Sequence, residues 1–294
     1  MRVWAISLVL LAACDRPVDQ KIDAKPAEIS FDGGDYTTAA AKVAHGERLN
    51  KIFGCAACHG EDHSGQNFGA MIPIVDGLWA TNISLTMPKM SDAQLEKLLR
   101  EGVHPTRDEI YIMPSKLTQF LGRRDMDALI AYLRTIEAKG KPTPPPPPGF
   151  EQAVAARLPD DYWRWQLPGQ KRDYHNAAEE AAYYAANQAP KIGTSAKLAQ
   201  GRYVAITVCS GCHGAALDGK GEDAGGIEAA SLYSDAEFDR LLTTSSSRDG
   251  RLLKMEWGFG HEVMPITKSE KSAVIAYVRA LVTDKAYRTQ HPPQ

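Results

Sequence analysis

Two copies of a Cys-x-x-Cys-His motif carry the most distinctive chemistry in this sequence. The first lies in GCAACHGED at 54–62, and the second lies in CSGCHGAALDG at 209–219. The six residues are Cys55, Cys58, His59, Cys209, Cys212 and His213. This pattern is compatible with a zinc site, a redox dithiol or a covalently attached haem.

The context of the motifs separates these three chemistries. A structural zinc site needs four ligands, usually two neighbouring pairs, whereas these pairs stand far apart in the chain. A thioredoxin-like dithiol expects a βαβ context and gives the histidine no role. Covalent haem accounts for all three residues, because the thiols join the vinyl groups and the adjacent histidine binds the iron. We therefore interpret each motif as a haem c attachment site, with His59 and His213 as iron ligands.

Each iron also has a sixth coordination position, and two Met-Pro pairs provide candidates for it. Met113 lies in YIMPSK and Met264 lies in EVMPIT, and we take the two pairs to occupy the same place in a repeat. The sequence thus predicts Met113 and Met264 as the sixth ligands. The other methionines near the motifs are interpreted as packing residues, and three histidines that could compete for iron are expected at the surface. These methionines are Met87, Met90 and Met255, and the histidines are His63, His104 and His261.

The chain is interpreted as an internal duplication, because three segments recur in the same order around the motifs. AKVAHG at 41–46 matches AKLAQG at 196–201, SDAQL at 91–95 matches SDAEF at 234–238, and IAYLR at 130–134 matches IAYVR at 275–279. The middle pair begins with a capping box, Ser-x-x-Gln or Ser-x-x-Glu, followed by apolar residues at helical spacing. Each half is therefore predicted to hold an early helix, the motif, a middle helix and a last helix. Strand signals are nearly absent, so the predicted fold is mostly α with long loops.

Composition shifts divide the chain into further segments. The KPTPPPPPGF stretch at 141–150 predicts an extended polyproline linker, because proline neither continues a helix nor donates to a sheet. We expect that 151–189, which includes Trp163 and Trp165, packs between the domains. The full prediction is a signal peptide at 1–14, a flexible tether at 15–37, a first domain at 38–140, the linker at 141–150, the interdomain segment at 151–189, a second domain at 190–284 and a tail at 285–294.

The first fourteen residues, MRVWAISLVLLAAC, resemble a bacterial lipoprotein signal. Arg2 precedes an apolar run that is too short for a standard membrane span, and the run ends in Leu11-Ala12-Ala13-Cys14. Cys14 is also the odd one among five cysteines. We therefore predict lipidation of Cys14 and anchoring on the periplasmic side of a bacterial membrane. The net charge of −2 gives no reason to expect nucleic-acid binding.

Together, the Cys-x-x-Cys-His, the Met-Pro and the aromatic-bearing last helix resemble class I cytochrome c, twice over. The first half, with LWATNISL at 78–85 and REGVH at 100–104, looks most like the cytochrome subunits of bacterial membrane-bound dehydrogenases. The resemblance implies two tandem domains, each of several short helices wrapped around a covalently bound haem and joined by the proline-rich linker. It also implies that Gly46 and Gly201 permit the first helix to cross the last against Tyr132 and Tyr277, and that the carbonyl of Pro73 orients His59.

The function expected from these features is electron transfer rather than catalysis. Two covalent haems with both axial positions filled leave no substrate site, so the protein would relay single electrons between redox proteins. A dehydrogenase, an oxidase or a small electron carrier would serve as partner. Two alternatives stay open: a dihaem redox enzyme of peroxidase-like or thiosulfate-oxidising type with a displaceable ligand, and a haem subunit of a dehydrogenase complex.

Overall fold

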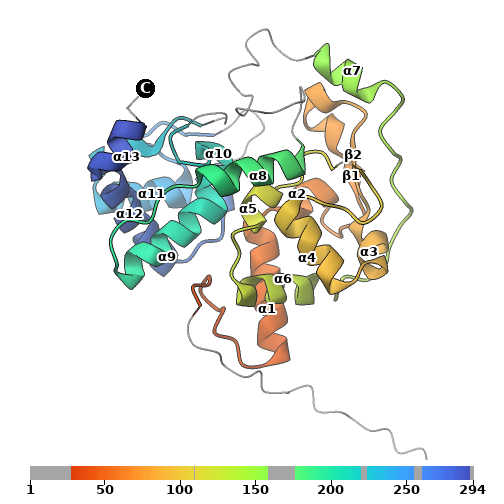
Figure 1. The fold of residues 1–294 in the computed structure, drawn as a ribbon, viewed down its shortest axis with the longest axis horizontal. Helices are drawn as coiled ribbons and strands as arrows, with labels where there is room; N and C mark the ends of the chain where they lie inside the picture. The colour runs from red at the N-terminus through yellow and green to blue at the C-terminus, as the bar shows by residue number, and fades with distance from the viewer. Residues whose placement is uncertain (1–27, 109, 158–175, 220–223, 255–259, 292–294) are drawn as a thin grey trace, which may run out of the picture.

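The part of the chain that the structure describes is mostly helical, with one two-stranded β-ladder (Figure 1). The computed structural model describes residues 28–108, 110–157, 176–219, 224–254 and 260–291. Cys14, Trp163, Trp165 and Met255 lie outside these residues. Within the described ranges, no helix has the length and apolar character needed to cross a bilayer.

The described part of the first half contains six α-helices, three short 3-10 helices and the ladder. The α-helices are α1 Ala39–Ile52, α2 Cys55–His59, α3 Ile83–Thr86, α4 Asp92–Glu101, α5 Ser115–Thr118 and α6 Arg123–Leu133, and the strands are β1 Gln66–Asn67 and β2 Trp79–Ala80. The two strands are antiparallel, with Gln66 opposite Ala80. The predicted early, middle and last helices are α1, α4 and α6.

The second half repeats this order. Its helices are α9 Ala196–Val204, a π-helical turn η5 Ala205–Cys209, α10 Ser210–His213, α11 Asp235–Thr244, α12 Lys268–Thr283 and α13 Lys285–Gln290. Both predicted capping boxes are present. The Ser91 and Ser234 hydroxyls each accept from the backbone N–H of the third helical residue, and the side chain of that residue accepts from the serine backbone N–H. The middle helices of both halves therefore begin where the sequence predicts.

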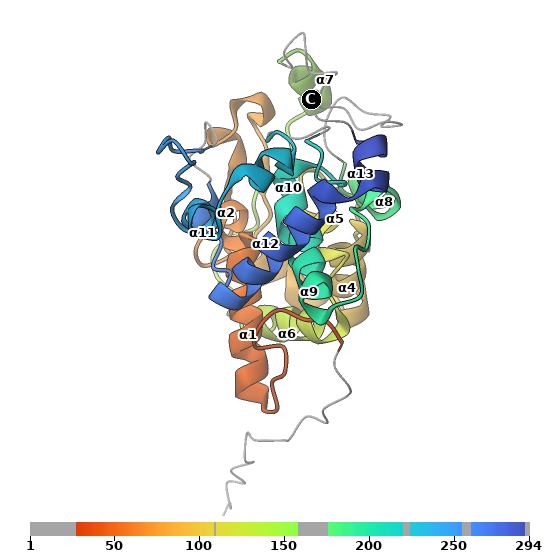
Figure 2. The ribbon, with the colours of Figure 1, turned by 90° about the vertical axis from the view of Figure 1, so that its left-hand side faces the viewer.

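In each half the first helix crosses the last one at a glycine. An added Cβ at Gly46 would stand 2.0 Å from the Ala128 carbonyl oxygen, and one at Gly201 would stand 2.0 Å from that of Ala273. Such a Cβ would also meet the Cβ of Tyr132 or Tyr277 at 2.7 Å in both cases. Figure 2 shows α12 passing across α9 in the second half. The expected glycine crossing is thus confirmed, with the same geometry twice.

The two halves share one hydrophobic core rather than forming separate globules. The same cluster of buried apolar side chains includes Leu49 and Leu129 from the first half and Val204 and Leu281 from the second. Residues 28–37, predicted as part of a flexible tether, bond to both halves, since the Phe31 N–H donates to Asp125 and the Asp32 N–H donates to Glu270, each at 2.8 Å. Phe31 is 1% exposed, because its ring packs where the halves meet; the tether prediction is wrong for this part.

Two other predicted segments also pack against the halves. The proline stretch runs along the first half, where Pro147 lies against Gly77, and it leads into α7 (Phe150–Ala155), whose Phe150 is buried. The expected tail contains α13, where Tyr287 is buried and donates to the Ala216 carbonyl at 3.0 Å. It is therefore part of the second half rather than a free tail.

The helix α8 (Ala177–Asn187) comes from the segment expected to pack between the domains. It lies against α4 and α5 of the first half, and Figure 1 places it between them and the second-half helices. Its Tyr184 is fully buried and donates to the Ser210 carbonyl of the second half at 3.1 Å. The described part of this segment therefore contacts both halves.

Candidate functional site

Each Cys-x-x-Cys-His motif lies on a helical turn that ends at a left-handed glycine. In the first copy, α2 covers the motif and Gly60 follows with φ of 83°. In the second copy, α9 continues through the π-helical turn into α10, and Gly214 follows with φ of 81°. Residues three and four apart lie on the same side of a helix, so each turn presents two thiols and one imidazole together.

The loops after the motifs have matching backbones. Each has a non-glycine residue in the left-handed region four positions past the histidine, and each closes with a hydrogen bond to the histidine carbonyl. The matched features are φ of 59° at His63 and 66° at Leu217, and bonds of 2.7 Å from Gly65 N–H to His59 and 2.8 Å from Gly219 N–H to His213. The two candidate sites are therefore built from the same local structure.

Both motif histidines have one ring nitrogen fixed by a backbone carbonyl. His59 Nδ1 lies 2.8 Å from the Thr81 oxygen, and His213 Nδ1 lies 2.6 Å from the Gly225 oxygen. A carbonyl oxygen only accepts, so Nδ1 carries the proton and Nε2 keeps its lone pair. Burial also lowers the pKa of both imidazoles, which favours the neutral form that binds metal. Both residues therefore fit the role of an axial haem ligand.

The carbonyl that orients His59 differs from the expected one. Family resemblance implies Pro73, whereas the structure uses Thr81, just after β2. The short ladder between β1 and β2 brings this carbonyl back to the motif, since Gln66 pairs with Ala80. In the second half Gly225 performs the same task without a proline. A carbonyl acceptor needs only a backbone position, so the residue type gave no signal in the sequence.

The motif cysteines do not have the environment of a redox dithiol. Burial raises the pKa of Cys55 and Cys209 to about 12, and of Cys58 to about 11. Reactive dithiols instead have a lowered pKa, because the thiolate is the nucleophile. Among the described residues, no group of three or more His, Cys, Asp and Glu side chains could hold a metal ion. The raised pKa values of these three cysteines disfavour the dithiol interpretation.

Met113 lies between the middle and last helices of the first half, as the sequence predicts. Its side chain is partly buried against the shared core. Ile112 before it adopts a left-handed φ of 57° and Pro114 follows it, so the backbone on both sides is restricted. Met87 and Met90 are buried in the core, which confirms their interpretation as packing residues.

Both Met-Pro pairs share one backbone feature, since the residue two positions after each methionine donates its N–H to the methionine carbonyl at 2.8 Å, but the second pair lies closer to the last helix. Met113 stands 19 residues before Tyr132, whereas Met264 stands 13 residues before Tyr277. The two tyrosines hold matching positions at the helix crossing. Met264 is partly buried against the core like Met113, and it stands three residues before Thr267, the N-cap of α12, with no counterpart of α5 between them.

The three histidines expected at the surface have different environments. His104 is partly exposed, whereas His63 is buried, and Asn50 Oδ1 lies 3.0 Å from its Nε2. His261 lies beside a motif histidine: its ring centre is 6.1 Å from that of His213, with 20° between the planes. Its Nδ1 is buried and has no hydrogen-bond partner in the structure. The surface prediction is therefore wrong for His63, whereas His261 is partly exposed like His104, with its Nδ1 buried.

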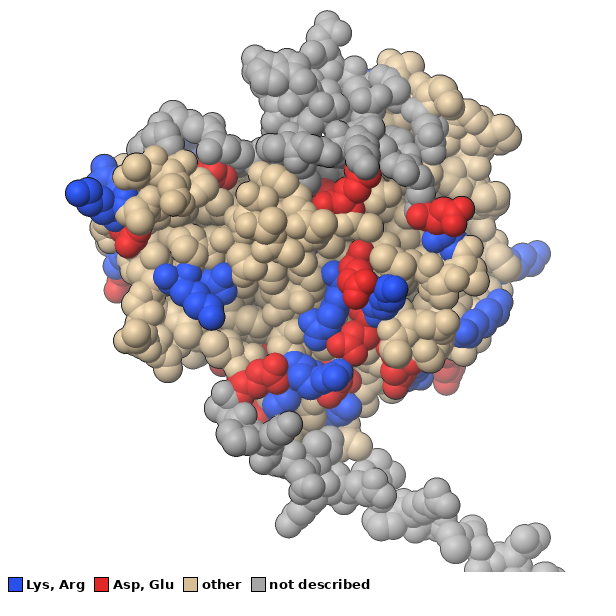
Figure 3. All heavy atoms as spheres, viewed as in Figure 1, with Lys and Arg blue, Asp and Glu red and all other residues tan. Residues whose placement is uncertain are grey.

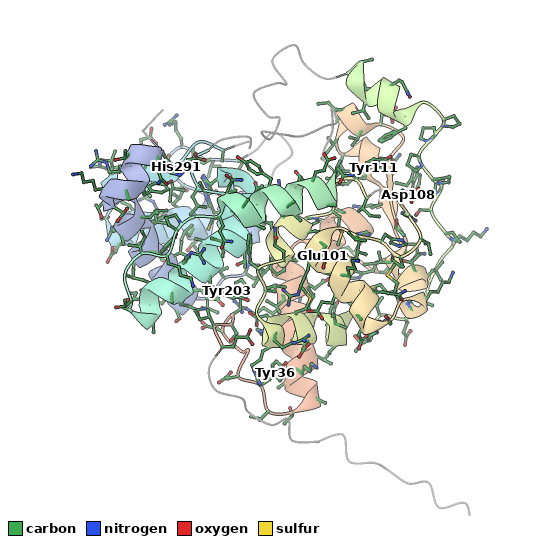
Figure 4. All side chains as sticks on the ribbon, viewed as in Figure 1. Tyr36, Glu101, Asp108, Tyr111, Tyr203 and His291 are labelled. Carbon is green, nitrogen blue, oxygen red and sulfur yellow. The ribbon has the colours of Figure 1, made fainter. Side chains whose placement is uncertain are left out.

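A buried polar cluster between the halves was missed by sequence reasoning. Asp125 on α6 is fully buried; its carboxylate accepts from the Tyr203 hydroxyl at 2.6 Å and from the Phe31 N–H at 2.8 Å, and lies 2.6 Å from His45 Nε2. Figure 4 labels Tyr203 on α9, facing the first half. No local motif links residues this far apart in the chain, so the sequence gave no signal for them.

The comparisons with known proteins support part of this assignment. The cytochrome c family model matches residues 43–137, which include the first motif, Met113 and α6. No curated protein gives a significant match to the chain. The family match supports a c-type cytochrome with covalently bound haem and a haem-based role in electron transfer.

Proposed function

We propose that this protein is a two-haem c-type cytochrome that relays single electrons between redox proteins at the periplasmic side of a bacterial membrane. The observation that carries the proposal is the second copy of the motif loop, with the same left-handed positions and the same histidine-to-carbonyl bond. The family match covers only the first copy. The repeated geometry therefore supports a second haem where the match does not extend.

In this proposal the chain holds each haem through two thioether bonds and an axial histidine. The residues are Cys55, Cys58 and His59 for the first haem, and Cys209, Cys212 and His213 for the second. Haem iron supplies one-electron chemistry between its ferrous and ferric states. The chain supplies attachment, a fixed imidazole tautomer and burial, through the Thr81 and Gly225 carbonyls and the shared core.

Met113 and Met264 remain the proposed sixth ligands, with different support. Met113 has restricted backbone on both sides and lies within the family match. Met264 competes with His261, which lies beside His213, and with Met255. Replacing Met264, His261 and Met255 one at a time by alanine separates the candidates. Loss of a methionine ligand removes the methionine–iron absorption band of the second haem, and loss of a histidine ligand removes its low-spin histidine signature.

A haem count tests the proposal directly. Intact mass and the alkaline pyridine spectrum should give two haems per chain in the wild type. The double substitution Cys209→Ser/Cys212→Ser should leave one haem, and Cys55→Ser/Cys58→Ser, the matched control, should leave the other. A wild-type protein with one haem, attached at the first motif, would refute the relay.

A redox enzyme is the second candidate, favoured by the competition for the second iron. A displaceable ligand there would open a site for substrate. The ferrous protein should then bind carbon monoxide at one haem. The electron-carrier proposal expects no such binding in the native state, so the same spectrum distinguishes the two functions.

Membrane attachment is proposed through a lipid on Cys14, and redox proteins are the proposed partners, such as a dehydrogenase, an oxidase or a small electron carrier. On the face in Figure 3, acidic and basic side chains are interspersed, which suits a soluble domain held beside the membrane. The change Cys14→Ser should move the protein from the membrane fraction to the soluble periplasm. Recovery of the variant in the membrane fraction would contradict the anchor.

A further inference from the structure

The helix α5 connects the first candidate site to the second. It begins at Ser115, two residues after Met113, and the Ser115 N–H donates to the Met113 carbonyl at 2.8 Å. Leu117 N–H donates to the Pro114 carbonyl at 3.0 Å. The position of Leu117 is therefore fixed by the same short turn that fixes Met113.

Leu117 lies directly against the second Cys-x-x-Cys-His motif. A Cβ built on Gly211 would stand 2.9 Å from Leu117 Cδ1, closer than real Cβ contacts. Gly211 immediately precedes Cys212, and the matching position in the first motif is Ala57. Gly211 therefore brings the backbone of the second motif against the Leu117 side chain, at the position where the first motif has alanine.

The surrounding contacts hold this junction in place. On one side, Gln119 Nε2 donates to the Ala181 carbonyl of α8 at 2.9 Å. On the other side, the Tyr184 hydroxyl of α8 donates to the Ser210 carbonyl, inside the second motif, at 3.1 Å. Leu117 packs in one cluster with buried Tyr184 and Ala215. The helix α8 thus binds α5 and the second motif together.

We propose that the contact between Leu117 and Gly211 is the electron route between the two haem sites. The route runs from Met113 through the backbone to Leu117, across one van der Waals contact to Gly211, and along the chain to Cys212. Tunnelling through bonds weakens less with distance than tunnelling through gaps, so the single non-bonded step controls the rate. One ferrous iron becomes ferric and one ferric iron becomes ferrous, and no proton or bond changes. The inference rests on the proposed two-haem function.

The test compares two leucines that are both half-buried. Leu117→Ala widens the gap to Gly211, whereas Leu98→Ala removes the same side-chain atoms from α4, beside α5 but off the proposed route; the Leu98 backbone carbonyl, which accepts from Ser115 Oγ at 2.9 Å, is kept. Leu117→Met keeps an apolar chain of similar volume at the contact and serves as the rescue variant. In half-reduced protein, exchange of the haem methyl resonances by NMR reports the rate of electron transfer between the two irons. Haem content, axial-ligand spectra and the midpoint potential of each haem are measured alongside.

The expected result is slower exchange in Leu117→Ala, with wild-type exchange in Leu98→Ala and Leu117→Met. Haem content, ligand bands and potentials should stay unchanged in all three variants. Equal exchange rates in Leu117→Ala and Leu98→Ala would overturn the route while leaving the two-haem function intact. A wild-type protein with a single haem would instead refute the proposed function, and the haem count detects that separately.

Discussion

The glycine at each helix crossing gives the sharpest test of the fold. In α1, Gly46→Ala gains about 1 kcal/mol from helix propensity. Its new Cβ would stand 2.0 Å from the Ala128 carbonyl oxygen, although real Cβ atoms keep at least 3.0 Å. The nearby atoms are backbone, which cannot rotate away, so α1 and α6 must separate. Overpacking of this kind costs roughly 1–3 kcal/mol, and a backbone clash belongs at the upper end.

The expected net effect is a loss of about 2 kcal/mol, since a cost near 3 kcal/mol exceeds the propensity gain. The same distances recur at Gly201 against Ala273, so Gly201→Ala should lose the same amount. For a cooperative unit of this size, about 2 kcal/mol lowers Tm by roughly 4–8 °C. Thermal unfolding of the haem-loaded protein, followed by far-ultraviolet circular dichroism, measures this shift.

The control is the reverse change on the same helix. Ala44 is exposed on α1, so Ala44→Gly should lose about 1 kcal/mol from propensity alone. A neutral or stabilising Gly46→Ala would refute the close crossing. Opposite signs for Gly46→Ala and Gly201→Ala would refute the structural equivalence of the two halves.

Three further predictions address the junction and the helix caps. Arg48→Met leaves the fully buried Glu270 carboxylate without its cation, which should cost about 3 kcal/mol in urea unfolding; a loss below that of an exposed ion pair would contradict it. Burial and a neighbouring carboxylate raise the pKa of Tyr203 well above its ordinary value of 10.0. Its contribution to stability is therefore complete below pH 10 and is lost at higher pH by about 1.4 kcal/mol per pH unit; the wild type should lose stability more steeply above pH 10 than Tyr203→Phe, and parallel curves would argue against it. Ser91→Ala and Ser234→Ala should each cost about 1 kcal/mol in thermal unfolding, and an unequal pair would show that the two capping boxes are not equivalent.

The sequence by itself determined the features that depend on neighbouring residues. The motif turns and the capping boxes involve residues within five positions, so local spacing predicts them. The resemblance to class I cytochrome c implied the crossings at Gly46 and Gly201, which the structure confirms. The repeat also predicts Met264 as the counterpart of Met113, and this stays a prediction, because the two methionines stand 13 and 19 residues before their matching tyrosines.

Tertiary structure alone decided how the two halves meet. The carbonyls of Thr81 and Gly225 orient the histidines through their backbone, which leaves no trace in residue type. Leu117 and Gly211 are 94 positions apart in the chain, and their contact depends on how the halves pack. Local propensity carries no information about such distant contacts, because they form only when one buried core excludes water from both segments at once. The sequence therefore predicted two haem sites, and the packing of the shared core determined what lies between them.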